Sequence, residues 1–165
     1  MPAIDDIADG DELLASWGQS VADALNGPTT SYAVSLSAAS VNPTLGSGSS
    51  AVGAYKDMGN GLLYVEFEIT FGSSGVAAGT GTYGVTLPTT TTKPATSGII
   101  LSTLRFYDDS ANQVSFGVAV WSTSTSFTMR VVNGPNSASA IVANNVPQTW
   151  AANDILAGSL LVMQA

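Results

Sequence analysis

The strongest constraint on the fold is a run of nine residues in which apolar and polar side chains alternate. Every second position is apolar: Leu63, Val65, Phe67, Ile69 and Phe71. The positions between them are occupied by Tyr64, Glu66, Glu68 and Thr70. Because successive side chains of a strand point to opposite faces, this pattern predicts a β-strand with one face in the core and the other in solvent.

The same period of two recurs along the chain after Pro28. Further strands are predicted at 31–39, 51–58, 81–87, 99–107, 113–121, 125–132 and 157–164. Turn-forming residues separate them, so adjacent strands are expected to pair as antiparallel hairpins. We predict an all-β fold, an antiparallel two-sheet β-sandwich of jelly-roll-like topology. The expected inward rows include Val114, Phe116, Val118 and Val120, and Phe127, Met129 and Val131.

The first 28 residues differ from the rest in charge and in period. Residues 1–26 hold six acids and no base, whereas residues 27–165 hold six acids and four bases. Asp9 and Glu12 have the spacing of a capping box, and Gly27-Pro28 ends the helical pattern. Between them runs an apolar stripe: Leu13, Leu14, Trp17, Val21 and Leu25. We predict one short α-helix in an N-terminal attachment segment, residues 1–28, followed by a β-sandwich domain, residues 29–165.

A helix of about sixteen residues is marginal in water without a partner. Its apolar stripe must therefore pack on the β domain of its own chain, associate with copies of itself, or dock on a larger assembly. The sequence leaves these alternatives open.

The residue types of the chain argue against catalysis. There is no His and no Cys, so a pair of carboxylates in a cleft is the remaining route to acid–base chemistry. Glu66 and Glu68 could form such a pair, but both belong to one strand, whereas glycosidase carboxylates flank a cleft from separate elements. We predict that the protein is not an enzyme and uses no cofactor.

Metal, nucleic acid and membrane are also disfavoured as partners. Asp108, Asp109, Ser110 and Asn112 offer oxygen ligands, but the loop lacks the glycine and the bidentate Glu of a calcium-binding EF-hand loop, so we predict an ordinary turn. A net charge of -8 repels phosphate backbones and anionic membrane surfaces. No apolar run reaches the roughly 20 residues of a membrane helix.

Several side chains are candidate surface contacts. The outward row of the 99–107 strand contains Leu101, Arg105 and Tyr107, a mixture enriched at protein interfaces, although the N-terminal helix could equally cover it. Trp121, at a strand end, and Trp150, in a long loop, are candidate contacts for a glycan or a neighbouring subunit. The alternative is that both rings fill the ends of the sandwich.

Five stretches carry a resemblance to a known family: NPTLGSG at 42–48, AYKDMG at 54–59, YVEFEITFG at 64–72, GTYGVTLP at 81–88 and WAAND at 150–154. The resemblance extends from Asn42 onward and covers about three quarters of the chain. These stretches resemble a module of bacteriophage structural proteins, especially of phages that infect actinobacteria. In that family the module is similar to the β-rich ends of minor tail proteins and to head fibres or capsid decorations.

The resemblance implies a non-enzymatic, trimeric virion component. We therefore expect a capsid decoration or head fibre on the exterior surface of the virion, made in the host cytoplasm. It would be attached through its N-terminal segment, with the sandwich projecting outward. The expected partners are copies of the chain itself and the major capsid or tail proteins of the same virion. The alternative is a minor tail protein or receptor-binding module that contacts a host-surface glycan through loops 122–126 or 133–150.

Overall fold

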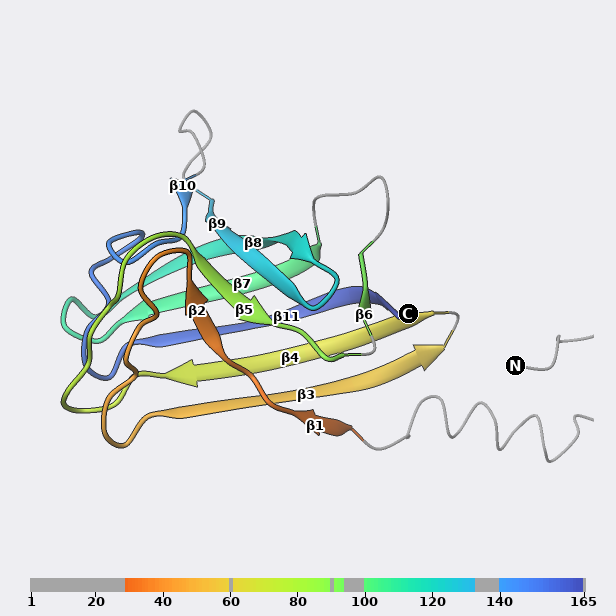
Figure 1. The fold of residues 1–165 in the computed structure, drawn as a ribbon, viewed down its shortest axis with the longest axis horizontal. Helices are drawn as coiled ribbons and strands as arrows, with labels where there is room; N and C mark the ends of the chain where they lie inside the picture. The colour runs from red at the N-terminus through yellow and green to blue at the C-terminus, as the bar shows by residue number, and fades with distance from the viewer. Residues whose placement is uncertain (1–28, 60, 90, 94–99, 133–139, 165) are drawn as a thin grey trace, which may run out of the picture.

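The structure, a computed structural model, describes five stretches of the chain: residues 29–59, 61–89, 91–93, 100–132 and 140–164. These residues form β-strands and connecting turns and contain no helix (Figure 1). The predicted N-terminal helix and its stripe lie outside the described residues: Leu13, Leu14, Trp17, Val21 and Leu25.

Eleven strands are present among the described residues. The long strands are β3 (Ser50–Gly59), β4 (Leu62–Thr70), β7 (Leu101–Asp108), β8 (Gln113–Thr123), β9 (Ser126–Val131) and β11 (Ile155–Gln164). The short strands are β1 (Thr30–Tyr32), β2 (Leu36–Ala38), β5 (Tyr83–Thr86), β6 (Thr91–Thr92) and β10 (Ala140–Ile141). All eight predicted strands are confirmed, although the first is divided into β1 and β2. The sequence analysis missed β6 and β10, which have two residues each.

The strands form one antiparallel sheet rather than two separate ones. Its order is β1-β3-β4-β11-β7-β8-β9-β5-β2, with β10 paired to β9 and β6 paired to β11. The all-β antiparallel prediction is therefore confirmed, whereas the division into two sheets is not. The sheet curls, as Figure 1 shows, so that β5 and β2 lie over the face formed by β3 and β4.

The two terminal strands of this order are consecutive in the chain. Only residues 33–35 separate β1, which pairs with β3, from β2, which pairs with β5. The backbone N–H of Thr86 donates to the Ser35 carbonyl at 3.1 Å, and the Thr86 hydroxyl accepts from the Ser35 N–H at 2.9 Å. This short segment links the two edges of the sheet and holds it curled.

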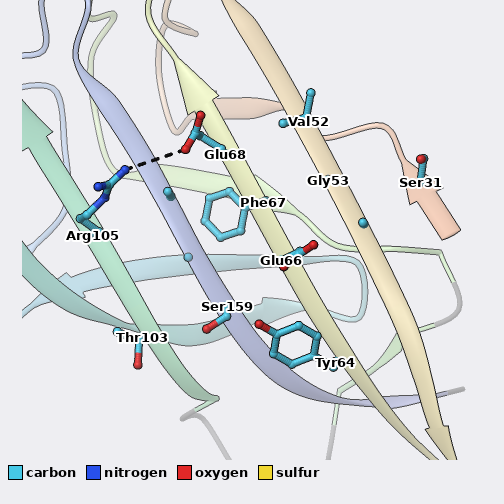
Figure 2. Close-up of a pocket in the computed structure, with 13 residues that line it drawn as sticks. Ser31, Val52, Gly53, Tyr64, Glu66, Phe67, Glu68, Thr103, Arg105 and Ser159 are labelled. Atoms are coloured by element: carbon cyan, nitrogen blue, oxygen red, sulfur yellow. Dashed lines mark ion pairs between the residues drawn. The ribbon is translucent and has the colours of Figure 1, made fainter. Parts of the chain in front are cut away.

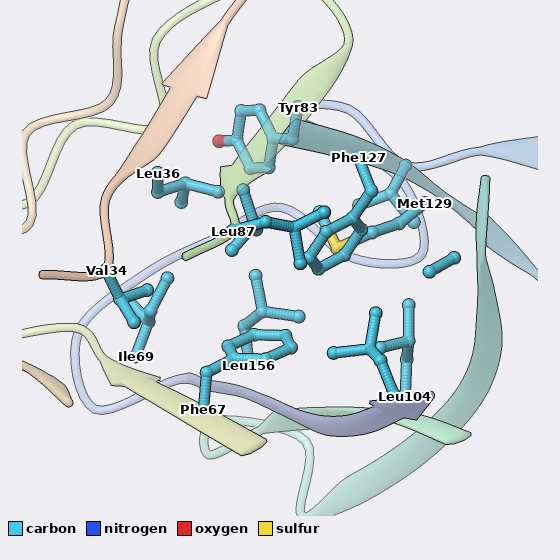
Figure 3. Packing of buried hydrophobic residues seen from close by; sticks show 14 of the residues in the cluster. Val34, Leu36, Phe67, Ile69, Tyr83, Leu87, Leu104, Phe127, Met129 and Leu156 are labelled. Carbon is cyan, nitrogen blue, oxygen red and sulfur yellow. The ribbon is translucent and has the colours of Figure 1, made fainter. Parts of the chain in front are cut away.

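The curled sheet encloses a single apolar core (Figure 3). The alternation predicted for residues 63–71 is confirmed, because its five inward apolar residues are buried: Leu63, Val65, Phe67, Ile69 and Phe71. The inward row of β9 is also confirmed: Phe127, Met129 and Val131. The rings of Phe67 and Phe127 lie 5.6 Å apart, so opposite parts of the sheet meet across the core.

The inward face predicted for β8 is wrong. Phe116 is 57% exposed, whereas Gly117, Ala119 and Trp121 face the core. A Cβ at Gly117 would lie 2.6 Å from a ring carbon of Phe106, so this inward position of β8 has no room for a side chain.

One end of the core is filled by aromatic rings and stabilised by a buried carboxylate. Trp150 stacks on Phe71 with ring centroids 5.3 Å apart, and its indole N–H donates to the Ala143 carbonyl at 3.0 Å. Asp154 is completely buried. Its carboxylate accepts hydrogen bonds from the backbone N–H of Asp109 (3.0 Å), the backbone N–H of Ala151 (2.9 Å) and the side-chain amide of Gln148 (3.2 Å). Asp154 thus ties the loop before β11 to the turn between β7 and β8.

Removing the Asp154 carboxylate should strongly destabilise the domain. We expect Asp154→Ala to lower the free energy of unfolding by about 3 kcal/mol, because three donors lose a buried, charged acceptor. Asp154→Asn keeps one acceptor oxygen and should cost less. Urea unfolding followed by tryptophan fluorescence measures both values. Asp57→Asn, which changes an exposed carboxylate, is the matched control. Equal losses for Asp154→Ala and Asp57→Asn would contradict the assignment.

Candidate functional site

The outer face of β3, β4, β11 and β7 is hollowed into an open groove of about 630 Å³, which we call the outer groove (Figure 2). Its lining carries two carboxylates, one guanidinium, one phenol and three hydroxyls: Glu66, Glu68, Arg105, Tyr64, Ser31, Thr103 and Ser159. The volume lies within the range of about 300–1,000 Å³ that is usual for ligand sites.

Strand register brings these side chains together. Across one row of the sheet, Ala157 of β11 lies between Glu68 of β4 and Arg105 of β7. In the next row, Ser159 lies between Glu66 and Thr103. Glu66, Glu68 and Arg105 therefore flank small side chains on β11, and this difference in size makes the hollow.

The floor of the outer groove is thin because the core presses against it from below. A Cβ at Gly158 would lie 2.5 Å from Cδ2 of Leu104 and 2.9 Å from the carbonyl oxygen of Thr103. A Cβ at Gly53 would lie 2.3 Å from Cγ2 of Val34. Glycine at these two positions lets β11 and β3 lie close over the core.

An exposed ion pair crosses the outer groove, as Figure 2 shows. Nη2 of Arg105 lies 3.8 Å from Oε2 of Glu68, and each side chain is 46% exposed. A pair this exposed contributes at most about 1 kcal/mol to stability. Both groups can therefore exchange this contact for one with a ligand at little cost to the fold.

An apolar patch adjoins the groove on the same face. We call it the outer patch, and it comprises Leu62, Tyr64, Leu101, Leu161 and Met163, whose exposed fractions range from 37% to 72%. Leu161 is paired with Tyr64 on one side and with Leu101 on the other, and Met163 is paired with Leu62. Contiguous apolar surface of this kind is typical of protein–protein contacts.

The structure brings some of the predicted contact residues together and separates others. Leu101 belongs to the outer patch and Arg105 to the outer groove. Tyr107 lies further along the outer face of β7, where its hydroxyl donates to Oδ1 of Asn112 at 3.2 Å. Trp121 and Trp150 are only 6% and 3% exposed, so the prediction that they contact a ligand at the surface is wrong. They fill the interior, as in the alternative interpretation.

Sequence reasoning missed the small residues of the outer groove. Ala157 and Ser159 carry no catalytic or ligand-binding motif. Their significance comes from the pairing of β11 with both β4 and β7, three strands that are distant in the chain. Two sequence signals pointed to the groove: the outward row of β4, which places Glu66 and Glu68 on one face, and the outward row of the 99–107 strand, which contains Arg105.

In the acidic turn between β7 and β8, the Asp108 carboxylate accepts hydrogen bonds from residues of the same turn. Oδ1 of Asp108 accepts hydrogen bonds from the Ser110 hydroxyl at 2.7 Å and from the backbone N–H of Ala111 at 3.0 Å. These bonds, that from Ser110 foremost, lower the pKa of the Asp108 carboxyl. No group of three or more metal-ligating side chains occurs in the part of the chain that the structure describes.

The Ser110→Ala variant should raise the pKa of Asp108 toward the ordinary carboxyl value. Because the pKa of Asp108 is lowered in the folded state, its hydrogen bonds stabilise the fold at pH values above the ordinary carboxyl pKa. This contribution is lost as the pH falls through the lowered pKa of the folded protein. Carboxyl ¹³C shifts in an NMR titration report the change, and Ser122→Ala is the control. An unchanged Asp108 titration in Ser110→Ala would show that the hydroxyl bond has no effect.

A comparison with protein-family models finds no match, and comparisons with curated proteins and with solved structures find no significant match either. Among the described residues, no helix has the length and apolar character needed to span a membrane. The interpretation of function therefore depends on the outer groove, the outer patch and the sequence.

Proposed function

We propose that the protein is a non-enzymatic component of a bacteriophage virion surface, a capsid decoration or head fibre. The observation that carries this proposal is the outer face, where an apolar patch adjoins an open groove on paired strands. Such a face suits contact with other molecules. The opposed parts of the curled sheet, which meet at Phe67 and Phe127, serve as the two layers of a sandwich-type domain.

The groove suits binding better than acid–base chemistry. Both of its carboxylates come from β4, whereas glycosidases hold their two carboxylates on opposite sides of the scissile bond. The Glu68 carboxylate lies beside Arg105 in an open setting. A carboxyl group that donates a proton near neutral pH needs a raised pKa, which comes from burial or from a neighbouring negative charge.

The stretches that resemble phage modules contain residues with clear structural roles. In WAAND at 150–154, Trp150 fills the aromatic end of the core and Asp154 accepts three hydrogen bonds. Asn153 has a positive φ of 64°, a conformation that Asn tolerates better than most residues. Trp150 and Asp154 therefore serve the fold, and attachment to a particle has to come from elsewhere in the chain.

Attachment is assigned to that segment. Residues 1–26 carry a charge of -6, against -2 for the remainder, and contain the apolar stripe at helical spacing. A charged, amphipathic segment beside a weakly charged β domain is suited to dock on the major capsid or tail proteins. The β domain then projects from the virion exterior.

Particle association tests the proposal. Quantitative mass spectrometry of purified virions should find hundreds of copies for a decoration protein, and a chain that is absent from virions would refute the proposal. A variant lacking residues 1–26 should keep its β-sheet circular dichroism but no longer co-sediment with particles, whereas the full-length chain does. If the truncated protein unfolds, the segment belongs to the core and the attachment role is wrong.

The second candidate function is a minor tail protein or receptor-binding module. The outer groove favours it, because an open, polar hollow can bind a ligand from the host surface. A count of only a few copies per virion would select this function over decoration.

We expect the protein to form a homotrimer, in which a neighbouring copy covers the four aliphatic residues of the outer patch and leaves Tyr64 of the groove accessible. Leu161→Asp places a charge at the centre of the patch, and burying it against another apolar surface is costly. The molar mass from light scattering should fall to that of the monomer. Val114→Asp is the control, because Val114 is 47% exposed on β8 outside the patch. A monomeric wild-type protein, or a Leu161→Asp variant with unchanged mass, would contradict this assembly.

A further inference from the structure

We propose that the outer groove binds an extended, uncharged glycan. This proposal rests on the proposed function in one respect, the source of the glycan, which is a cell surface. The class of ligand is inferred from the residues that line the groove.

The polar groups of the groove match the chemistry of sugars. Each sugar hydroxyl both donates and accepts hydrogen bonds. The Glu66 carboxylate accepts, the Arg105 guanidinium donates, and the Ser159 hydroxyl does either. Register spreads these groups over two adjacent rows of the sheet, so that several hydroxyls of one chain can be bound together.

Tyr64 adds an apolar contact at the end of the groove. Tyr64 is 37% exposed, and its ring lies on the same face as Glu66 and Ser159 (Figure 2). A tyrosine presents an apolar body and a polar tip, which suits the C–H face and the hydroxyls of a sugar ring. The small floor residue Ala157 leaves room for the ligand between the longer side chains.

The charges of the groove disfavour anionic ligands. Two carboxylates face one guanidinium, and that guanidinium is already close to Glu68. A phosphate or sulfate group would meet net negative charge here, within a chain of net charge -8.

A peptide also fits poorly. Strand addition requires a free sheet edge, but β4 is paired with β3 and β11, and β11 is paired with β4 and β7 over the groove. A docked helix requires a row of apolar anchors, whereas the lining is mainly polar or small. An uncharged polyhydroxylated chain remains the ligand class that fits.

The test uses the purified full-length protein and defined probes. An array of neutral hexasaccharides of glucose, mannose, galactose and N-acetylglucosamine is screened, and the strongest member is titrated by calorimetry. A heparin hexasaccharide and an oligolysine peptide serve as charged comparators. We expect one or more neutral hexasaccharides to bind, with an affinity that changes less than twofold between 50 and 500 mM salt, because no net charge is neutralised.

Two variants locate the site. Ala157→Leu fills the floor without removing a polar group and should weaken binding at least tenfold, and Glu66→Gln should weaken it severalfold. Ala111→Leu, which adds the same side chain in the exposed turn between β7 and β8, should bind as the wild type does. Circular dichroism confirms that each variant is folded.

The proposal is overturned if no neutral hexasaccharide binds, if only a charged comparator binds, or if a folded Ala157→Leu variant binds unchanged. If Ala157→Leu does not fold, the Glu66→Gln titration decides, and unchanged affinity there overturns the proposal. These outcomes are distinct from failure of the proposed function, which is judged by the presence of the chain in virions.

Discussion

The contact between opposite parts of one curled sheet determines the rest of this structure. Phe67 and Phe127 meet across the core, and residues 33–35 join the strand at one edge to the strand at the other. Without this link, the inward row of β4 would lie open to water, because a single sheet cannot bury its own apolar face unless it curls or packs against another layer. The curled sheet covers its own apolar face, as a second sheet does in a sandwich. Residues 33–35 provide the connection that a longer loop makes between two sheets.

This constraint also shapes the outer face. Since the inward positions are filled by large side chains, several backbone positions beneath the groove must be glycine, as at Gly53 and Gly158. The outward positions are freed from core packing, and there β4 carries carboxylates while β11 carries small residues. The outer groove therefore results from a difference in side-chain length on a continuous sheet. Hydrogen-bonded strands, rather than loops, fix its shape.

The sequence predicts features that depend on local alternation along one strand, and it fails where contacts between distant strands decide the structure. The period of two located β4 and β9 correctly, because burial on one face is a local property of each strand. It failed on β8, where the core demands Gly117 beside the Phe106 ring, a contact between strands that no local pattern displays. Trp121 and Trp150 were assigned to the surface as one option because of their loop-like surroundings, but long-range ring packing buries Trp150. The shape of the outer groove could not be predicted from the sequence, because the groove forms only when β4, β11 and β7 pair in register.

The outer groove and the outer patch are close enough to influence each other. Ser159 of the groove and Leu161 of the patch are two residues apart on the same face of β11, a separation of about 7 Å along a strand. Tyr64 belongs to both. A neighbouring copy that covers the patch would therefore form a wall at the end of the groove and lengthen the surface offered to a ligand. Repetition of a weak site over many copies raises the total affinity for a polymeric ligand without any new contact. A shallow, open groove that would bind weakly in a single chain is thus well suited to a protein displayed in many copies.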